Sequence, residues 1–405
     1  MKLFCRENYF SKEEVNTGRQ PEIDVVKGIL ILGLMIVHCF TEIFPQESGP
    51  VAFFFVILCS NFIGAALFML IMGMSSMYSK HGSPEDMLRR GFGLLTFAAL
   101  LNILRVGLPN SIAYLINGEK SYLLNFALII GNDIMWFAGL AFLTGGLLRR
   151  GKLNDIKMLI VAVVMSIAGY FLKGVGTGNY GIDQLLGHIW GTKTESCFPL
   201  FNWFVFFTAG RLYGTLYRHL KDKREWSKKI LPIGLVISVV YVIIATNPDQ
   251  KVFVLFNDDP IGLYWMAPLD AVFCLVGGIT ALALACLVVK KDGPVFLTFI
   301  GRNLNKFYCV SWVIINFVAT VIRLIGVWGK TGSLVTVAVC SFVIVLTYLI
   351  VLLYKKSLEE KFRKFFGKHR KLWIVMIWVI VAVAAVAIIV YGQNDFPGMY
   401  NGYLD

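Results

Sequence analysis

Residues 22–44 read EIDVVKGILILGLMIVHCFTEIF, an apolar stretch long enough to cross a bilayer as one helix. It carries an ionisable residue, His38, about two-thirds of the way along. A titratable side chain in hydrocarbon is costly unless it faces a partner or a water-filled cavity, so it marks a candidate functional site. Lys27 precedes His38 by roughly 16 Å of helix, and Glu42 follows it at i+4 on the same face.

The composition indicates a membrane protein with many spans. Of its 405 residues, 57% are hydrophobic and 16% are charged, and the mean hydropathy is +0.70. Apolar windows of spanning length recur through the whole chain. They predict eleven transmembrane helices, at residues 24–44, 52–74, 91–108, 122–148, 157–174, 198–217, 230–246, 263–289, 303–326, 332–354 and 372–391.

No interruption between these spans is long enough for a sizeable soluble domain. A basic segment separates the last span from the rest, so we expect ten core helices and one appended helix. The fold class is therefore all-α, polytopic and membrane-embedded. The predicted parts are an N-terminal segment (1–23), a ten-helix domain (24–355), a basic linker (356–371) and an additional helix with an outer tail (372–405).

The basic residues predict the orientation, because short loops rich in Lys and Arg stay cytoplasmic. With the N-terminus inside, 30 of the 38 Lys and Arg residues lie in segments 1–27, 75–90, 149–157, 218–229, 290–306 and 355–371. We therefore expect a multi-pass protein of the cell membrane with a cytoplasmic N-terminus. The net charge of +13 follows from this topology and gives no reason to expect nucleic acid. A basic inner face favours anionic membrane lipids.

Metal and nucleotide chemistry have no sequence support. The eight cysteines are scattered and mostly lie in apolar stretches, without the clustering of a zinc site. The Gly-x-x-x-x-Gly-Lys match GLLRRGK (146–152) lacks the Ser or Thr that follows the lysine in a phosphate-binding loop. The Gly-x-Gly-x-x-Gly match GTGNYG (176–181) lies in the predicted outer loop after the fifth span, not between a strand and a helix. We predict no metal and no soluble-type nucleotide site.

The first span resembles a family signature. The string RQPEIDVVKGILILGLMIVH (19–38) has an acidic residue, a basic residue three positions on, a glycine, and a histidine separated from the basic residue by ten positions. This pattern resembles the transmembrane acyltransferases, the superfamily that contains acyltransferase-3 and heparan-α-glucosaminide N-acetyltransferase-like proteins. Later stretches are similar in the same order: LFMLIMGMSSMYSK (67–80), LRRGFGLLTFAALLNILR (88–105), NDIMWFAGLAFL (132–143), FPLFNWFVFFTAGRLYG (198–214) and FIGRNLNKFYCVSW (299–312).

The resemblance covers roughly residues 19–355 and departs from the family at two positions. Lys27 stands where the family usually has arginine, which keeps the charge but loses bidentate geometry. Ser311 stands where many relatives carry histidine. These differences leave the subfamily open, and His38 is unaffected by them.

The resemblance implies a ten-helix acyltransferase bundle that carries an acyl group, usually acetyl, from cytosolic acyl-CoA to an acceptor on the outer side. The acceptor would be a hydroxyl or amine of an extracytoplasmic glycan or glycolipid. An imidazole suits proton transfer near neutrality, so His38 would act as base or brief acyl carrier. Glu42 would orient the imidazole, as a carboxylate does in triad logic.

CoA phosphates would need cations at the inner face. Alternatives are open for some candidates: Lys27 could pair with Asp24 and extend toward the head groups, and Arg89 and Arg90 could mark topology only. Two of the arginines follow glycines at inner helix ends, where a ligand could approach closely. The predicted acetyl-CoA-binding residues are Lys27, Arg89, Arg90, Arg211, Arg302 and Lys306.

Asp133 completes the predicted catalytic residues, because NDIMWFAGL places it inside the predicted fourth span. It would either line the active cavity or pair with Asn102, Asn61 or a lysine. His188 lies in a long outer loop, where we expect a solvated side chain that could alternatively contact the acceptor.

The main rival function is a secondary transporter or flippase for a cell-envelope precursor. Transporters often contain inverted repeats with paired Gly- or Pro-interrupted helices, and the sequence shows no such pairing. A lipid-linked glycosyltransferase would need a carboxylate in a sizeable first outer loop, whereas FPQESGP (44–50) is short. A non-catalytic membrane sensor is a third alternative.

Overall fold

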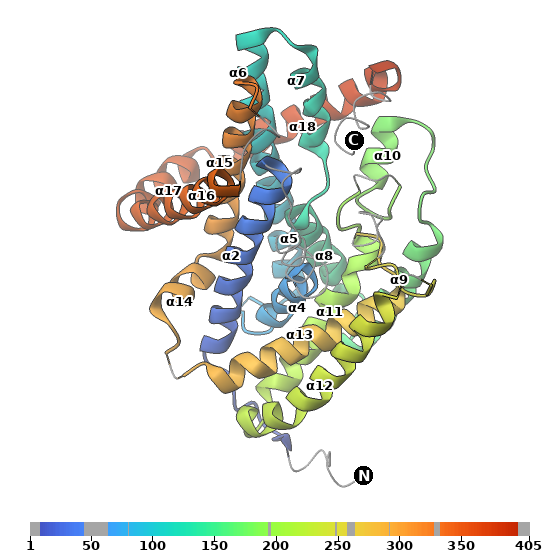
Figure 1. Ribbon diagram of the computed structural model, residues 1–405. Helices are drawn as coiled ribbons and strands as arrows, with labels where there is room; N and C mark the ends of the chain where they lie inside the picture. Colours follow the sequence, from blue (N-terminus) through green and yellow to red (C-terminus); the bar gives the residue numbers. More distant parts are fainter. Residues whose placement is uncertain are drawn as a thin grey trace.

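The computed structural model describes residues 9–43, 64–79, 81–192, 196–247, 249–256, 264–290, 292–327 and 333–395. The regular secondary structure in these ranges is helical, and within them the only β-type pairing is an isolated bridge between Phe10 and Leu220. The all-α, polytopic prediction is confirmed. Figure 1 shows α2 running through the middle of the bundle, with the neighbouring helices arranged around it.

The helices follow the predicted spans closely. In chain order they are α2 (Pro21–Ile43), α4 (Gly64–Ser76), α5 (Pro84–Asn102), η3 (Ile103–Gly107), α6 (Leu108–Asn117), α7 (Lys120–Leu124), η4 (Asn125–Ile130), α8 (Ile134–Arg150), α9 (Asp155–Phe171), α10 (Tyr180–Leu186), α11 (Leu200–Arg218), α12 (Lys223–Ala245), α13 (Pro268–Val288), α14 (Val295–Arg302), α15 (Leu304–Leu324), α16 (Ser333–Leu353), η5 (Tyr354–Leu358), α17 (Glu359–Lys368) and α18 (Arg370–Asp395).

Seven helices in the described part of the chain are long and apolar enough to cross a membrane. They include α2, α12, α13, α15 and α18, together with the continuous helices 84–117 and 335–368. The other predicted spans correspond to α4, α8, α9 and α11, which are shorter or more polar. Residues 52–63 of the predicted second span lie outside the described residues.

The predicted fourth span, residues 122–148, is not one helix. The chain forms α7 and the 3₁₀ turn η4, breaks at residues 131–133, and restarts as α8. Asp133 has extended backbone geometry and its side chain accepts hydrogen bonds from the N–H groups of Met135 and Trp136. Because Asp and Asn compete with the backbone for hydrogen bonds, they favour a helix start over a helix interior. The average hydropathy of residues 122–148 does not reveal this break.

Glycines allow several helices to pack at short range. A Cβ added at Gly301 would overlap the carbonyl oxygen of Asp24, and one added at Gly210 would overlap that of Leu70. Glycine permits such close backbone approach because it has no side chain. Gly301 and Gly210, which precede the predicted CoA-binding residues Arg302 and Arg211, therefore allow α14 to pack on α2 and α11 to pack on α4. They do not provide close approach for a ligand.

The appended helix α18 is attached to the same bundle. It packs against α5, η4 and α10. The indole Nε1 of Trp378 donates to Thr96 Oγ1 at 3.1 Å, and Asn179 Nδ2 donates to the carbonyl of Ile389 at 3.3 Å. Its first turns lie beside the start of α5 and its end reaches α10. The predicted domain boundary at 372 therefore lies two residues inside this helix.

Candidate active site

His38 projects from α2 against an aromatic ring of α15. Its imidazole centroid lies 4.0 Å from that of Trp312, with the two planes tilted by 42°. The Nδ1 atom is buried, and it has no hydrogen-bond partner in the part of the chain that the structure describes. A buried ring nitrogen without a partner is costly, so this atom is a candidate for contact with a substrate.

Arg105 contacts the same tryptophan. Its guanidinium carbon lies 4.4 Å from the centroid of the Trp312 ring, and its Nε donates to Asn102 Oδ1 at 2.9 Å. The residue belongs to η3, a π-helical turn between α5 and α6. Such turns are frequent at functional sites. Arg105 is 8% exposed, and its charge also acts on His38.

Asp133 holds this arginine in place. Its Oδ2 lies 3.1 Å from Arg105 Nη2 and 3.5 Å from the hydroxyl of Tyr308 on α15. Its Oδ1 caps α8 through the two backbone N–H groups described above. The partner of Asp133 is therefore Arg105, and Asn102 takes part only through the arginine. The carboxylate is fixed from three sides.

This arrangement joins a potential base to a preorganised cation. The imidazole of His38 and the guanidinium of Arg105 both contact Trp312, so they approach the same volume between α2, η3 and α15. A fixed cation in a site of low dielectric can stabilise negative charge as it develops on a reacting carbonyl. The cluster can therefore support acyl transfer.

Glu42 does not orient His38 in this structure. Among the described residues no hydrogen bond joins the two side chains, and His38 Nδ1 is unpaired. The charges that act on the half-buried Glu42 are those of Arg323 and Arg105. The triad-like arrangement expected from the i+4 spacing is therefore not observed. Glu42 faces cations near the end of α2.

At the start of α2 the ion pairs also differ from expectation. Asp24 pairs with Arg19 at 2.6 Å and with Arg302 at 3.7 Å, and it forms no ion pair with Lys27. The ammonium of Lys27 is half-buried and has no ion-pair partner in the described ranges, although the charges of Asp24, Arg19 and Arg90 act on it. Lys27 is therefore available to an anion.

The other predicted CoA-binding cations have different surroundings. Arg211 is buried and is held by Asp155 Oδ1 and Ser76 Oγ, both at 3.0 Å. Its position indicates a helix-packing role, so we remove it from the proposed phosphate site. The three remaining cations are Arg90, which lies 4.3 Å from the Phe142 ring centroid, Arg89, which lines a cavity beside α18, and Lys306, which pairs with Glu359 at 3.4 Å.

His188 is buried, so the expected solvated side chain is wrong. Its Nε2 lies 2.9 Å from the carbonyl oxygen of Ile130, and its ring centroid lies 5.1 Å from that of Trp136. It belongs to the segment between α10 and α11, outside the membrane-spanning helices. Burial lowers the pKa of His188 from its usual 6.5 to about 4, and the backbone hydrogen bond opposes the shift only in part.

This pKa predicts a loss of stability in acid. Below pH 6.5 the unfolded chain binds a proton at residue 188 that the folded chain excludes until about pH 4. The native state should lose roughly 3 kcal/mol from this group between these values. Unfolding in detergent, followed from pH 7.5 to pH 4, should show a weaker pH dependence for His188→Asn than for wild type. Parallel curves for the two proteins would contradict the assignment.

Arg105, Tyr308 and Trp312 are the site residues that the sequence interpretation missed. Arg105 lies inside the predicted span 91–108. The rule that flags an intramembrane ion applies to it as well as to His38. Tyr308 and Trp312 carry no such signal, because aromatic residues are common in spans.

Comparison with known proteins identifies one family. The family model described as "Heparan-alpha-glucosaminide N-acetyltransferase, catalytic" matches residues 19–255, which is more than half of the chain. The match includes His38, Arg105 and Asp133, whereas α15 and α18 lie beyond it. No curated protein and no solved structure matches the chain.

Proposed function

Since the chain belongs to the heparan-α-glucosaminide N-acetyltransferase catalytic family, and is therefore a membrane acetyltransferase, we propose a specific reaction for it. The protein moves an acetyl group from cytosolic acetyl-CoA to a hydroxyl or amine of a glycan or glycolipid across the membrane. The observation that carries this proposal is that His38 and Arg105 both contact Trp312 in the bundle interior.

A second layer of cations supports the donor site. Lys27 lies eleven residues before His38 on α2, about 16 Å along the helix axis. Arg302 lies at the end of α14, which packs against the same part of α2, and Lys306 lies two residues into α15. Phosphates of acetyl-CoA would bind these cations. The pantetheine arm would extend along α2 and α15 and place the thioester beside His38.

Each step has a group available for it. His38 accepts the proton of the acceptor hydroxyl or amine while the acceptor attacks the thioester carbonyl. Arg105 stabilises the resulting oxyanion. The carbon–sulfur bond then breaks, and the departing thiolate takes the proton from His38, so the products are acetylated acceptor and CoA thiol. In a two-step variant His38 carries the acetyl group between donor and acceptor.

Three unpaired polar atoms support an acceptor site next to Asp133. They are Trp136 Nε1, Asn132 Oδ1 and His188 Nδ1, all buried and without a hydrogen-bond partner in the described part of the chain. The rings of Trp136 and His188 lie together, and Asn132 Nδ2 reaches the Gly187 carbonyl at 3.4 Å. An indole face with nearby hydrogen-bonding groups suits a sugar with several hydroxyls.

The proposed orientation follows from charge. A cytoplasmic N-terminus puts Lys27, Arg302 and Lys306 on the side that supplies acetyl-CoA. The segment between α10 and α11, which carries His188, then faces outward. We place the protein in the cell membrane on the same argument.

The test of the proposed function is acetyl transfer by purified protein. Full-length protein in liposomes should release CoA thiol from [¹⁴C]acetyl-CoA when a candidate glycan acceptor is present, and should transfer the label to that acceptor. A transporter would instead move the acceptor without consuming acetyl-CoA, and its flux would follow an ion gradient. Absence of both thiol release and labelled product across a panel of hydroxyl and amine sugars would reject the proposal.

Donor binding should depend on the cations at the start of α2. Lys27→Gln is expected to weaken acetyl-CoA binding about tenfold, because one charged hydrogen bond to phosphate is lost. Isothermal calorimetry in detergent measures this directly. Lys228→Gln makes the same charge change on an exposed residue of α12 and serves as the control. Equal affinities for Lys27→Gln and wild type would remove Lys27 from the donor site.

A further inference from the structure

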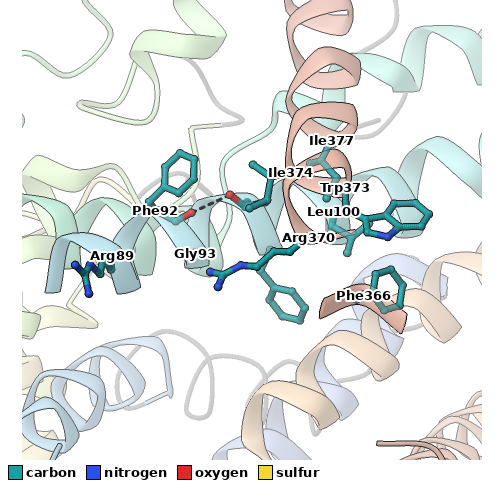
Figure 2. Close-up of a pocket in the computed structure, with 11 residues that line it drawn as sticks. Arg89, Phe92, Gly93, Leu100, Phe366, Arg370, Trp373, Ile374 and Ile377 are labelled. Atoms are coloured by element: carbon teal, nitrogen blue, oxygen red, sulfur yellow. Dashed lines mark hydrogen bonds between the residues drawn. The ribbon is translucent and has the colours of Figure 1, made fainter. Parts of the chain in front are cut away.

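A cavity of about 310 Å³ lies between α5, α17 and α18, apart from the candidate active site (Figure 2). None of His38, Arg105 and Asp133 lines it. Its walls are mainly aromatic and aliphatic, and include Phe92, Phe366, Ile374 and Ile377. A Cβ added at Gly93, which also lines the cavity, would meet nothing within 4 Å. The cavity is therefore an apolar groove with open space along α5.

Two guanidinium groups line this groove. Arg89 lies near the start of α5 and Arg370 is the first residue of α18. Neither has an anionic partner in the described part of the chain. In Figure 2 the Arg370 guanidinium extends along α5, on the side from which Arg89 projects. Both guanidinium groups are thus available to a negatively charged ligand.

A third feature is an unused hydrogen-bond donor. The indole N–H of Trp373, which lines the groove, is buried and has no partner among the described residues. Trp378, just over one turn further along α18, instead donates to Thr96 of α5. The indole N–H of Trp373 is therefore a free hydrogen-bond donor within an apolar wall. A ligand that fits must combine a long apolar part with a polar acceptor and an anion.

We propose that this groove binds one anionic glycerophospholipid from the leaflet that faces α17. Arg89 and Arg370 hold the phosphate, Trp373 donates to an ester carbonyl, and one acyl chain lies along Gly93 toward Ile377. The expected depth of the groove in the membrane agrees with this assignment. The adjacent helix α17 is basic, has exposed Phe362 and Phe365, and therefore suits the membrane surface. Juxtamembrane cations and interfacial tryptophan are typical of contacts with anionic lipid. The lipid would fasten α18 to α5.

Lipid retention tests the proposal. Full-length protein in neutral maltoside detergent is titrated with dioleoylphosphatidylglycerol or dioleoylphosphatidylcholine, and bound lipid is counted by native mass spectrometry. Wild type should bind one phosphatidylglycerol in preference to phosphatidylcholine. Arg89→Gln/Arg370→Gln should weaken that binding roughly 10- to 30-fold. The control Lys361→Gln/Arg363→Gln removes the same charge from exposed positions of α17; equal losses in both double variants would overturn the proposal.

A second variant fills the groove without changing charge. Gly93→Leu should fold, because its Cβ position is open and glycine is a poor residue inside a helix. It should still lose the bound phosphatidylglycerol, since the new side chain occupies the path of the acyl chain. Wild-type lipid binding by this variant, with a monodisperse elution profile, would show that the groove is not the site. Acetyl-CoA affinity is a separate readout and should be unchanged in Gly93→Leu.

Discussion

Replacement of His38 by alanine is expected to lower acetyl transfer by roughly 10²–10⁴-fold, the usual cost of losing a proton-transfer group. The imidazole packs against Trp312, and the charge of Arg105 acts on it. Membrane insertion and acetyl-CoA binding should be largely intact, because Lys27 of the proposed donor site lies about 16 Å away along α2. The measurement is thiol release from acetyl-CoA in liposomes with a glycan acceptor.

Two further variants make this result specific. Glu42→Gln should cost much less than His38→Ala, because no hydrogen bond joins Glu42 to the imidazole in the structure. His219→Ala changes a half-buried histidine at the end of α11 and is the matched control. Thiol release from His38→Ala at the wild-type rate would assign His38 to helix packing. A small amount of acetylated protein in wild type, absent from the variant, would support the two-step route.

The helices could be predicted from the sequence because hydropathy is a local property. Windows such as 24–44 and 303–326 coincide with α2 and α15 within a few residues. The break before α8 could not be read from a window average, although Gly131, Asn132 and Asp133 supply turn and cap chemistry at that point. At residues 131–133 the local side-chain chemistry interrupts the helix, although the hydrophobic pattern continues through this point.

The site could be predicted only where a single residue carried the signal. His38 stands out because a histidine within hydrocarbon is rare. Its surroundings depend on contacts between helices far apart in sequence, since Trp312 comes from α15 and Arg105 from η3. The position of Arg211 after a glycine at an inner helix end suggested a ligand-binding role, whereas Asp155, a carboxylate 56 positions away, neutralises it. Such pairings depend on packing, which one sequence does not reveal.

Removing the charge of Asp133 should produce a second large effect. Asp133→Asn leaves an oxygen that can cap α8 but leaves the Arg105 guanidinium buried without its anion. Breaking a buried pair on one side typically costs about 3–5 kcal/mol. Unfolding by dodecyl sulfate in mixed micelles measures the loss. Asn154→Ala removes only the cap of α9 and should cost about 1 kcal/mol; a similar cost for both variants would show that the ion pair contributes little.

The double variant Arg105→Gln/Asp133→Asn separates structure from catalysis. With both charges removed, no uncompensated ion stays buried, so most of the stability lost in Asp133→Asn should return. Transfer should stay at least 10²-fold below wild type, because the cation proposed to stabilise the oxyanion is absent. If stability and acetyl transfer recover together, Arg105 serves only to pair with Asp133. If stability returns alone, the guanidinium acts on the reacting acetyl group.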